Sequence, residues 1–278
     1  MNNKSAALFR ASNVVILDYP LDAALFSALL ICDKAVVVVD TNSRDHTLDL
    51  VRTLQKAWGP DRIVVVERQW EFDRMWQERV WDWGMEATDA EWLMFFDADE
   101  AIHESHARAI KALMTCSGTK MIRFPFVHLY ATPEYRAAFT LTHNTRLGRR
   151  SAGFRMRNWC TDATPQRAAC QMVYGPDERN AHLPQVPGLV TLDACPVMHY
   201  GWCRTARALA ISQAKQGAWY ADGAGLEDGH IPEITPHDFQ LAHQIERGFV
   251  TRYDGPHPAA MRDWFAQHAW EWGELENG

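Results

Sequence analysis

The chain has 278 residues, of which 47% are hydrophobic and 23% are charged, and its formal net charge is −7. This composition is typical of a globular protein with a substantial core, and it excludes an intrinsically disordered chain. The acidic balance gives no general attraction to nucleic acid or to an anionic membrane, although a local basic patch could still provide one. No apolar run approaches the roughly 20 residues that cross a bilayer, and residues 1–10 lack the apolar core of a signal peptide. We therefore expect a cytoplasmic protein.

The six cysteines form no Cys-x-x-Cys pair. Without a secretion signal they are most simply reduced thiols. Cys195, His199 and Cys203 are spaced four residues apart, which raises the alternative of a zinc site. Pro196 makes this stretch look extended rather than helical, and no fourth ligand is evident, so the spacing disfavours zinc.

Strands and helices alternate through the first half of the chain. Apolar, β-branched or aromatic runs predict strands, and apolar residues at helical spacing predict the helices between them. The expected strands are 14–17, 35–39, 63–66 and 92–96, and the expected helices are 21–31, 47–58 and 72–87. This alternation is typical of right-handed βαβ units, so the fold class is α/β, with a mostly parallel, Rossmann-like sheet flanked by helices.

The pattern changes after about residue 120. Residues 121–127 predict one more strand, in which Pro125 indicates an edge or a bend. Irregular segments follow, then a helix over 204–220, a loop over 223–236, and a helical tail over 239–274 that is broken at 254–258. We expect one domain over 1–220, with a first half at about 12–119 and a second half at about 120–220. The extension 221–278 is expected to pack on the same domain.

The acidic segment after the strand 92–96 is the strongest candidate site. Asp97, Asp99 and Glu100 directly follow five apolar residues. Open α/β sheets bind ligands beyond the carboxyl ends of their strands. Three carboxylates crowded there would repel one another unless a cation or a cationic ligand neutralised them. The alternative is an ordinary polar turn, because an Asp-x-Asp triplet alone is a weak signal.

These segments together resemble the family-two glycosyltransferases, which have the GT-A fold and use nucleotide-activated sugars. The resemblance covers roughly residues 12–215. It implies that 1–220 is a catalytic domain in which the half 12–119 binds the nucleotide and the half 120–220 lies on the acceptor side. The second expected strand ends in a segment similar to Asp-Asp-Gly-Ser-x-Asp-x-Thr, although Thr41-Asn42 replaces the usual Asp-Gly. The positions that match the family are Asp40, Ser43, Asp45 and Thr47, then Asp97 and Asp99, then the His199-Tyr200-Gly201 segment with Lys215.

The resemblance implies a sugar donor, most simply UDP-linked, and a hard divalent cation, Mn²⁺ or Mg²⁺. Such a cation prefers oxygen ligands and stabilises the charge that develops on the departing diphosphate. Asp99 is implied as the principal metal ligand, with Asp97 near the ribose or the metal and His199 as a further ligand or phosphate contact. Asp40 would accept a hydrogen bond from the base, and Lys215 would bind the donor. Each of these residues also has a purely structural reading, as a turn, cap or core side chain.

Inverting transfer, expected only from the resemblance, needs a general base that removes the proton of the acceptor hydroxyl. Asp162 lies about where related enzymes present a catalytic carboxylate, and Asp177 is its first rival. Glu178 and Asp193 are further rivals, and each could be a surface acid. Glu100 is a weaker candidate because it could simply open a helix.

Residues 136–157 hold six arginines and no acid, in contrast to the acidic chain around them. Arginine binds phosphate well, so Arg146 and Arg149 are predicted to contact the donor diphosphate. The alternatives are a phosphorylated or nucleic-acid acceptor, or a solvated hairpin whose arginines pair with acids elsewhere. The arginines are Arg136, Arg146, Arg149, Arg150, Arg155 and Arg157.

Three other classes share parts of this pattern. A haloacid-dehalogenase-type phosphatase also places Asp-x-Asp after an apolar strand, but it expects Thr or Val where this chain has Ala101. A sugar-phosphate nucleotidyltransferase expects a glycine-rich loop after its first strand, whereas residues 18–22 contain no glycine. A non-catalytic nucleotide-sugar-binding relative could keep the fold. The sequence therefore predicts a metal-dependent sugar transferase whose acceptor (glycan, lipid, protein or modified nucleic acid) it does not identify.

Overall fold

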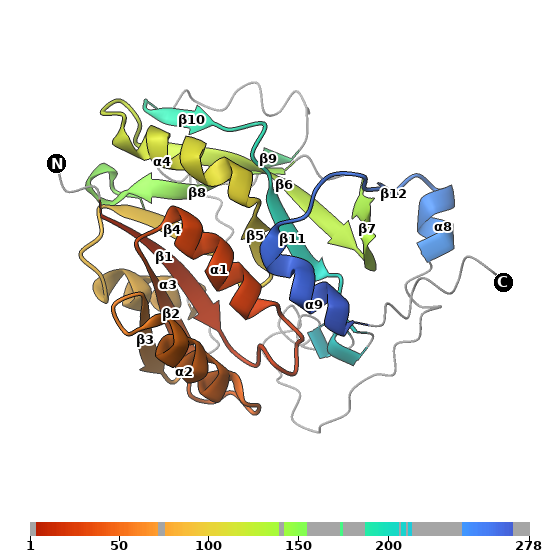
Figure 1. Ribbon diagram of the computed structural model, residues 1–278, viewed down its shortest axis with the longest axis horizontal. Coiled ribbons are helices and arrows are strands. Elements are labelled where there is room, and N and C mark those ends of the chain that lie inside the picture. Colours follow the sequence, from red (N-terminus) through yellow and green to blue (C-terminus); the bar gives the residue numbers. More distant parts are fainter. Residues whose placement is uncertain are drawn as a thin grey trace.

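The computed structural model describes residues 4–71, 76–138, 142–154, 173–174, 187–205, 207–209, 211–212 and 241–268. Figure 1 shows a twisted sheet with helices on both faces. Among the described strands the order is β12-β7-β6-β8-β4-β1-β2-β3. The predicted class, an α/β fold with a mostly parallel central sheet flanked by helices, is confirmed.

Four parallel strands form the half of the sheet that holds the apolar runs. They are β1 (Ser5–Ala11), β2 (Lys34–Asp40), β3 (Ile63–Arg68) and β4 (Trp92–Phe96), and their helices are α1 (Leu21–Ile31), α2 (Thr47–Trp58) and α3 (Trp76–Glu86). Val37 packs with α1 and α2 on one face, whereas Val36 packs with α3 on the other. Both faces are therefore covered, which explains why these strands read as continuous apolar runs.

The first strand differs from the prediction. The run 14–17 forms turns, and the strand lies earlier, at β1. Asn13 and Asp18 bracket the turns with φ values of 54° and 55°, which a strand does not allow. The prediction of 14–17 as a strand was therefore wrong, because its apolar residues fill a compact turn: Val14 and Leu17 are buried.

Strand β6 (Met121–Tyr130) connects the two halves of the sheet. Residues 121–125 pair with β8 (Thr142–Arg149), and residues 126–130 pair with β11 (Val197–Trp202). Pro125 lies where the strand changes partners, so the missing N–H falls at the junction. Of the two expectations for Pro125, an edge or a bend, the edge is wrong, because β6 has neighbours on both sides.

The second half of the sheet is mixed rather than irregular. Short strands complete it, and α4 covers the same face as α1. Its elements are β5 (Glu100–Ile102), α4 (Ala107–Thr115), β7 (Thr132–Ala137), β9 (Val173–Tyr174), β10 (Leu189–Thr191) and β12 (Val250–Arg252).

The predicted tail contains α8 (Leu241–Glu246), β12 and α9 (Arg262–Gln267). The break expected at 254–258 falls between β12 and α9, and β12 was not predicted. Met261 and Trp264 pack against Ala23 of α1 and Tyr200 of β11, so the described tail contacts both of these elements directly. None of the described helices is long and apolar enough to cross a membrane.

Candidate active site

The site is built where β4 ends. After Phe96 the chain turns and returns as β5, which pairs antiparallel with β11, so that Glu100 lies opposite His199. The N–H of Tyr200 donates to the carbonyl of Asp99 at 2.8 Å. The acidic segment and the His-Tyr-Gly segment, about 100 residues apart in the sequence, are therefore held side by side by backbone hydrogen bonds.

Asp97 is neutralised by two arginines of the same chain. Arg10 reaches it from β1 and Arg146 from β8, the latter at 3.3 Å. Burial alone would raise the pKa of Asp97, but the two guanidinium groups outweigh burial and hold the pKa well below its usual range. The first acid of the segment is consequently a carboxylate that already has its counter-ions.

Asp99 and His199 face each other, with 3.5 Å between Oδ2 and Nε2. Burial, followed by the charge of Asp97, raises the pKa of Asp99 to about 6. Burial also lowers the pKa of His199 to about 4, so its imidazole is neutral near pH 7. In the tautomer that carries its proton on Nδ1, the Nε2 lone pair and the neighbouring carboxylate oxygen form a donor set that suits a divalent cation.

Glu100 has a different environment from the one expected. It lies in β5, is 2% exposed, and accepts hydrogen bonds from Arg146 and from the N–H of Asp97. Burial raises its pKa to about 8 although Arg146 opposes the shift. The reading of Glu100 as the start of a helix was wrong, because its side chain completes the buried Arg146 pair.

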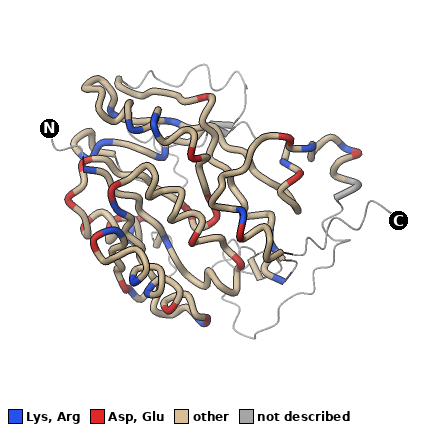
Figure 2. Tube along the Cα trace, in the orientation of Figure 1, with Lys and Arg blue, Asp and Glu red and all other residues tan. Residues whose placement is uncertain are grey.

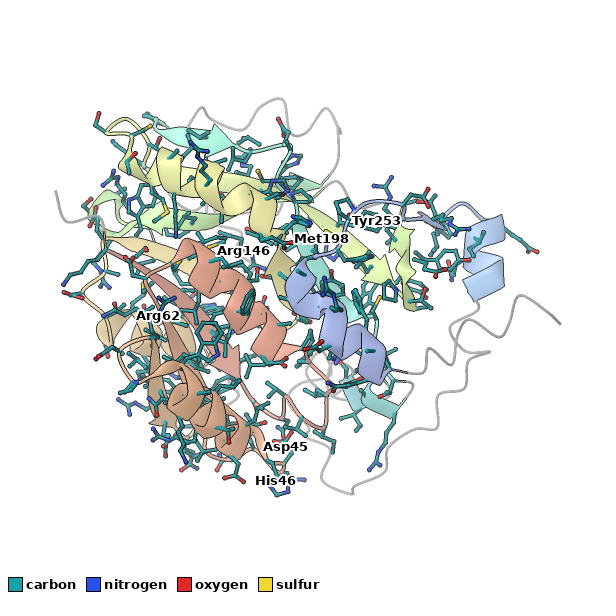
Figure 3. The ribbon with its side chains drawn as sticks, in the orientation of Figure 1. Asp45, His46, Arg62, Arg146, Met198 and Tyr253 are labelled. Carbon is teal, nitrogen blue, oxygen red and sulfur yellow. The ribbon has the colours of Figure 1, made fainter. Side chains whose placement is uncertain are left out.

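Arg146 enters the site through a β-bulge. Ile122 pairs with Leu147 and Arg123 with Thr145, which leaves Arg146 as the extra residue of β8. Bulges beside active sites redirect a side chain. Figure 3 labels Arg146 near the middle of the view.

Two arginine N–H groups at Asp97 are orphaned. Arg10 Nη1 and Arg146 Nε are buried and have no hydrogen-bond partner among the described residues. Because buried donors are costly to leave unpaired, an anionic group such as a donor diphosphate fits beside them. Arg10 also lies over the rings of Trp81 and Trp76, at 4.6 and 5.5 Å from their centroids, which fixes its guanidinium.

Gly201 is required by the close approach of β11 to the acidic segment. A Cβ atom on this residue would lie 2.6 Å from Asp99 Oδ2 and 2.6 Å from His199 Cε1. Arg204 supports the same corner: it donates to the carbonyls of Gly201 and Leu17 at 2.6 and 2.8 Å. Its charge lowers the pKa of Asp99 against the larger effect of burial.

Asp40 lies at the carboxyl end of β2 as predicted, but it is 1% exposed. Its oxygens accept from Ser12 Oγ and from the N–H groups of Asn42 and Trp70, at 2.9 to 3.2 Å. Asp40 thus connects the loops that follow β1, β2 and β3. The nucleobase of a donor could reach its carboxylate only if one of these loops moved. Asp45 accepts from the N–H of Thr47 beside the start of α2.

The structure corrects the role predicted for Arg149. Its guanidinium donates to the carbonyls of Met114, Cys116 and Thr119, at and beyond the end of α4, and lies 4.5 Å from the ring centroid of Trp92. Trp92 begins β4, so this is the opposite edge of the sheet from Asp97. The guanidinium of Arg149 is therefore engaged at a helix end and lies away from the acidic segment.

Arg150 has the same kind of role, since it donates to the carbonyls of Met85, Thr88 and Ala90 around the end of α3. Figure 2 shows acidic and basic residues interspersed along the described chain. The guanidinium groups of Arg149 and Arg150 are therefore both engaged with backbone carbonyls at helix ends.

Several predicted residues lie outside the described part of the chain, namely Asp162, Asp177, Glu178, Arg155, Arg157 and Lys215. Among the rivals for the general base, Asp193 is described: it is 81% exposed and accepts from His143 Nε2 at 3.1 Å. That position is typical of a surface ion pair.

The described residues include no cluster of three His, Cys, Asp or Glu side chains that alone would hold a metal ion. The zinc alternative is therefore not supported: Cys195 and Cys203 are buried, and burial raises the pKa of both thiols. A divalent cation shared between the protein and a diphosphate needs fewer protein ligands. Asp99 and His199 fit that chemistry, whereas Asp97 is engaged by arginines.

Sequence reasoning missed Arg10 and Arg204. Arg10 belongs to β1, the strand that was not recognised, although a lone cation within Ala-Leu-Phe-Arg-Ala is a usable signal for a residue at the mouth of a strand. The local sequence around Arg204 does not predict its hydrogen bond to the carbonyl of Leu17, because Leu17 is 187 positions away.

Comparison with known proteins gives one family match. Residues 21–124 match the sequence model described as glycosyl transferase family 2. This segment includes Asp40, Asp97 and Asp99, whereas Arg10 and His199 lie outside it. The search of curated proteins gave no match.

Solved structures with a similar arrangement include glycosyltransferases. TarS residues 1–349 from S. aureus is 13% identical, with 87% of this chain and 72% of that one covered and a TM-score of 0.47. Another TarS structure is covered over 41% of its chain. The mannosyltransferase PcManGT from Pyrobaculum calidifontis, in complex with GDP-Man and Mn²⁺, is 14% identical, with 99% and 86% covered and a TM-score of 0.47.

No functional conclusion follows from structural similarity at this level. The family match is a finding about the sequence itself, and it spans α1 to the first residues of β6, including the Asp-x-Asp segment. Residues 21–124 are therefore similar in sequence to glycosyl transferase family 2, in agreement with the resemblance expected from the motifs in this part of the chain.

Proposed function

We propose that this protein transfers a sugar from a nucleotide-sugar donor, most simply a UDP-sugar, to an acceptor hydroxyl in a reaction that uses Mn²⁺ or Mg²⁺. The observation that carries the proposal is the convergence of Asp97, Asp99 and His199. The two acids lie between the carboxyl end of β4 and the start of β5, and His199 lies on β11, in a chain whose residues 21–124 match glycosyl transferase family 2. This edge of an open α/β sheet is where ligands bind.

The residues of the site would have two different roles, cation binding and contact with the anionic donor. Asp99 and His199 Nε2, 3.5 Å apart, would hold the cation from the protein side. A bound Mn²⁺ or Mg²⁺ supplies electrostatic stabilisation for the charge that develops on the departing diphosphate. Arg10 and Arg146 hold Asp97 in place and present their orphaned N–H groups to the anionic side of the donor.

Neutral His199 is maintained by its surroundings. Its Nδ1 lies 3.0 Å from Nδ1 of His128, so one of these two nitrogens carries the proton and donates it to the other. Burial lowers the pKa of both rings, that of His128 to about 3. His128 thereby orients the histidine that faces Asp99, as outer partners of ligating histidines commonly do.

Transfer of a hexosyl group with inversion requires a base on the acceptor side, and we propose Asp162 first and Asp177 second. Asp162→Asn should leave UDP binding unchanged by calorimetry while stopping transfer. A normal transfer rate in that variant would redirect the assignment to Asp177.

A thermal-shift screen of nucleotide donors, with and without Mn²⁺, tests the proposal directly. A ligand that binds only the native state stabilises it by about 2.7 kcal/mol at a hundredfold excess over Kd. We expect a UDP-sugar to raise the melting temperature only with Mn²⁺, and the effect to be lost in Asp99→Asn. Equal stabilisation in excess chelator would reject the metal-dependent reading.

A product assay with the same donors separates the alternative classes. A non-catalytic relative would bind the donor without releasing the nucleotide from it. A phosphatase or nucleotidyltransferase would act on phosphate esters or nucleoside triphosphates instead. A nucleic-acid acceptor was considered because of the arginine segment. The backbone contacts of Arg149 and Arg150 remove two of the residues that supported it.

A further inference from the structure

Four rings form an array on one face of β6 and β11. In the parallel register His128 lies beside His199, and Tyr130 lies beside Trp202. The ring centroids are 4.7 Å apart in the first pair and 5.7 Å apart in the second, and His128 and Trp202 are 6.2 Å apart across the diagonal. We call these four residues the ring array.

A β-bulge puts Trp202 in the array. Tyr130 is two positions after His128 on β6, whereas Trp202 is three positions after His199 on β11. Because side chains alternate along a strand, a regular β11 would point Trp202 to the opposite face from His199. The extra residue is accommodated where Gly201 makes the close approach to Asp99.

The array begins at the proposed donor site and leads away from it. His199 lies 3.5 Å from Asp99, and the Tyr130–Trp202 pair lies one step further along both strands. His128, Tyr130, His199 and Trp202 are all partly exposed, in contrast to the buried residues between them, Leu129 and Tyr200. A ligand on the array would therefore lie next to the position where the donor sugar is released.

We propose that the ring array is the acceptor subsite and that it binds a sugar ring, with Trp202 and Tyr130 as the surfaces on which the ring stacks. This inference rests on the proposed transferase function. A pyranose offers both an apolar C–H face, which packs on aromatic rings, and hydroxyl groups, which the imidazole and phenol edges can bind.

The charges around the array favour a neutral sugar over a phosphate backbone. The nearest cations are committed elsewhere: Arg146 to Asp97 and Glu100, and Arg204 to two backbone carbonyls. The acid beside the array, Asp99, would repel a phosphate in the absence of a cation. A lipid chain would have to place hydrocarbon against the imidazole nitrogens and this carboxylate, which costs free energy.

Saturation-transfer NMR on the full chain tests the inference, with UDP and Mg²⁺ present so that the sample is diamagnetic. The probes are methyl β-D-glucopyranoside, methyl β-D-galactopyranoside and methyl α-D-mannopyranoside. Trp202→Phe and Trp202→Leu form a matched pair, because both stay apolar but only Phe keeps a ring. Trp58→Ala, on the exposed end of α2, is the control for loss of a surface tryptophan.

We expect at least one glycoside to receive saturation on its ring protons in the wild type and in Trp202→Phe. Binding should weaken by about tenfold in Trp202→Leu and in Tyr130→Leu, with UDP affinity unchanged. Absence of any glycoside signal while UDP binds, or equal glycoside binding in both leucine variants, would overturn the inference. Displacement of the glycosides by oligothymidylate or decanoate at lower concentration would overturn it in favour of another acceptor class.

The two proposals fail differently. If neither UDP nor any UDP-sugar binds with Mg²⁺ or Mn²⁺, the transferase proposal fails, whatever the glycosides do. Trp202-dependent glycoside binding in that case would leave a sugar-binding site without a donor site.

Discussion

Arg10 donates to Asp97 from the neighbouring parallel strand, because Phe9 and Phe96 pair in register and the next residues of both strands meet at the same edge. The acidic segment is thereby divided. Asp97 belongs to an arginine-bound network, and Asp99 faces His199 instead. The two acids of the Asp-x-Asp segment therefore have different environments and should respond differently to substitution.

Replacing Arg10 tests the first half of that division. Arg10→Met should destabilise the fold by about 1 to 3 kcal/mol, since it leaves a largely covered carboxylate with one cation fewer. The measurement is the free energy of unfolding in urea. Arg10→Lys keeps the charge and serves as the control, and a double-mutant cycle with Asp97→Asn should give a clear coupling energy. Additive effects of the two substitutions would show that the pair contributes nothing.

Asp99→Asn should separate activity from stability. We expect transfer and Mn²⁺-dependent donor binding to fall by about 100-fold or more, because a ligand charge is lost. The metal-free variant should be more stable than the wild type at neutral pH. The folded-state pKa of Asp99, about 6, lies above the unfolded value, so keeping this carboxylate ionised costs stability, and the cost grows as pH rises through that range.

Melting temperatures in chelator at pH 4.5 and pH 7.5 check the sign. The gain from Asp99→Asn should be larger at pH 7.5. Asp49→Asn, at a position whose side chain is 80% exposed, should show no comparable gain. Equal shifts at both pH values would contradict the raised pKa.

Gly201→Ala should damage the site through a single methyl group. The new Cβ would lie 2.6 Å from both Asp99 Oδ2 and His199 Cε1, so one of these groups must move. We expect donor binding in the presence of Mn²⁺ to weaken by about tenfold or more, measured by calorimetry. Gly118→Ala is the matched control, because a Cβ there meets nothing within 4 Å. Unchanged donor binding in Gly201→Ala would show that this approach is not part of the site.

Arg149 tests the corrected assignment of the arginine segment. Arg149→Met should lower the free energy of unfolding by about 1 to 3 kcal/mol, since three carbonyls around the end of α4 lose a charged donor. Donor affinity below the melting temperature should not change. Arg108→Met, on the exposed side of α4, is the control. A loss of UDP affinity without loss of stability would restore the original prediction.

The strands that could be predicted from the sequence are those buried on both faces. Runs such as 35–39 and 92–96 are recognised by their continuous apolar residues. The acids that follow them mark the carboxyl ends of the strands. Strand β1 lacked that signal, since Ser5 and Arg10 interrupt its small apolar residues, and the apolar turn at 14–17 imitated a strand. The neutralisation of Asp97 by Arg10 was lost together with β1.

The side-chain placements at the bulges could not be predicted either. Arg146 and Trp202 reach their positions because one extra residue shifts the alternation of β8 and β11. A period of two read from the sequence assigns such residues to the wrong face, and only the pairing register reveals the shift. Bulges are common next to active sites, so local sequence rules fail where function requires an irregular backbone.

Strand β6 sets a fixed distance between the proposed donor site and the proposed acceptor subsite. It passes Phe126 beneath the guanidinium of Arg146, then His128 beside His199, then Tyr130 beside Trp202, without a break in the backbone. At about 3.3 Å per residue, the four steps from Phe126 to Tyr130 span roughly 13 Å. If donor and acceptor bind at the two ends, their separation is set by covalent geometry, and the enzyme would choose among acceptor hydroxyls by length measured along this strand.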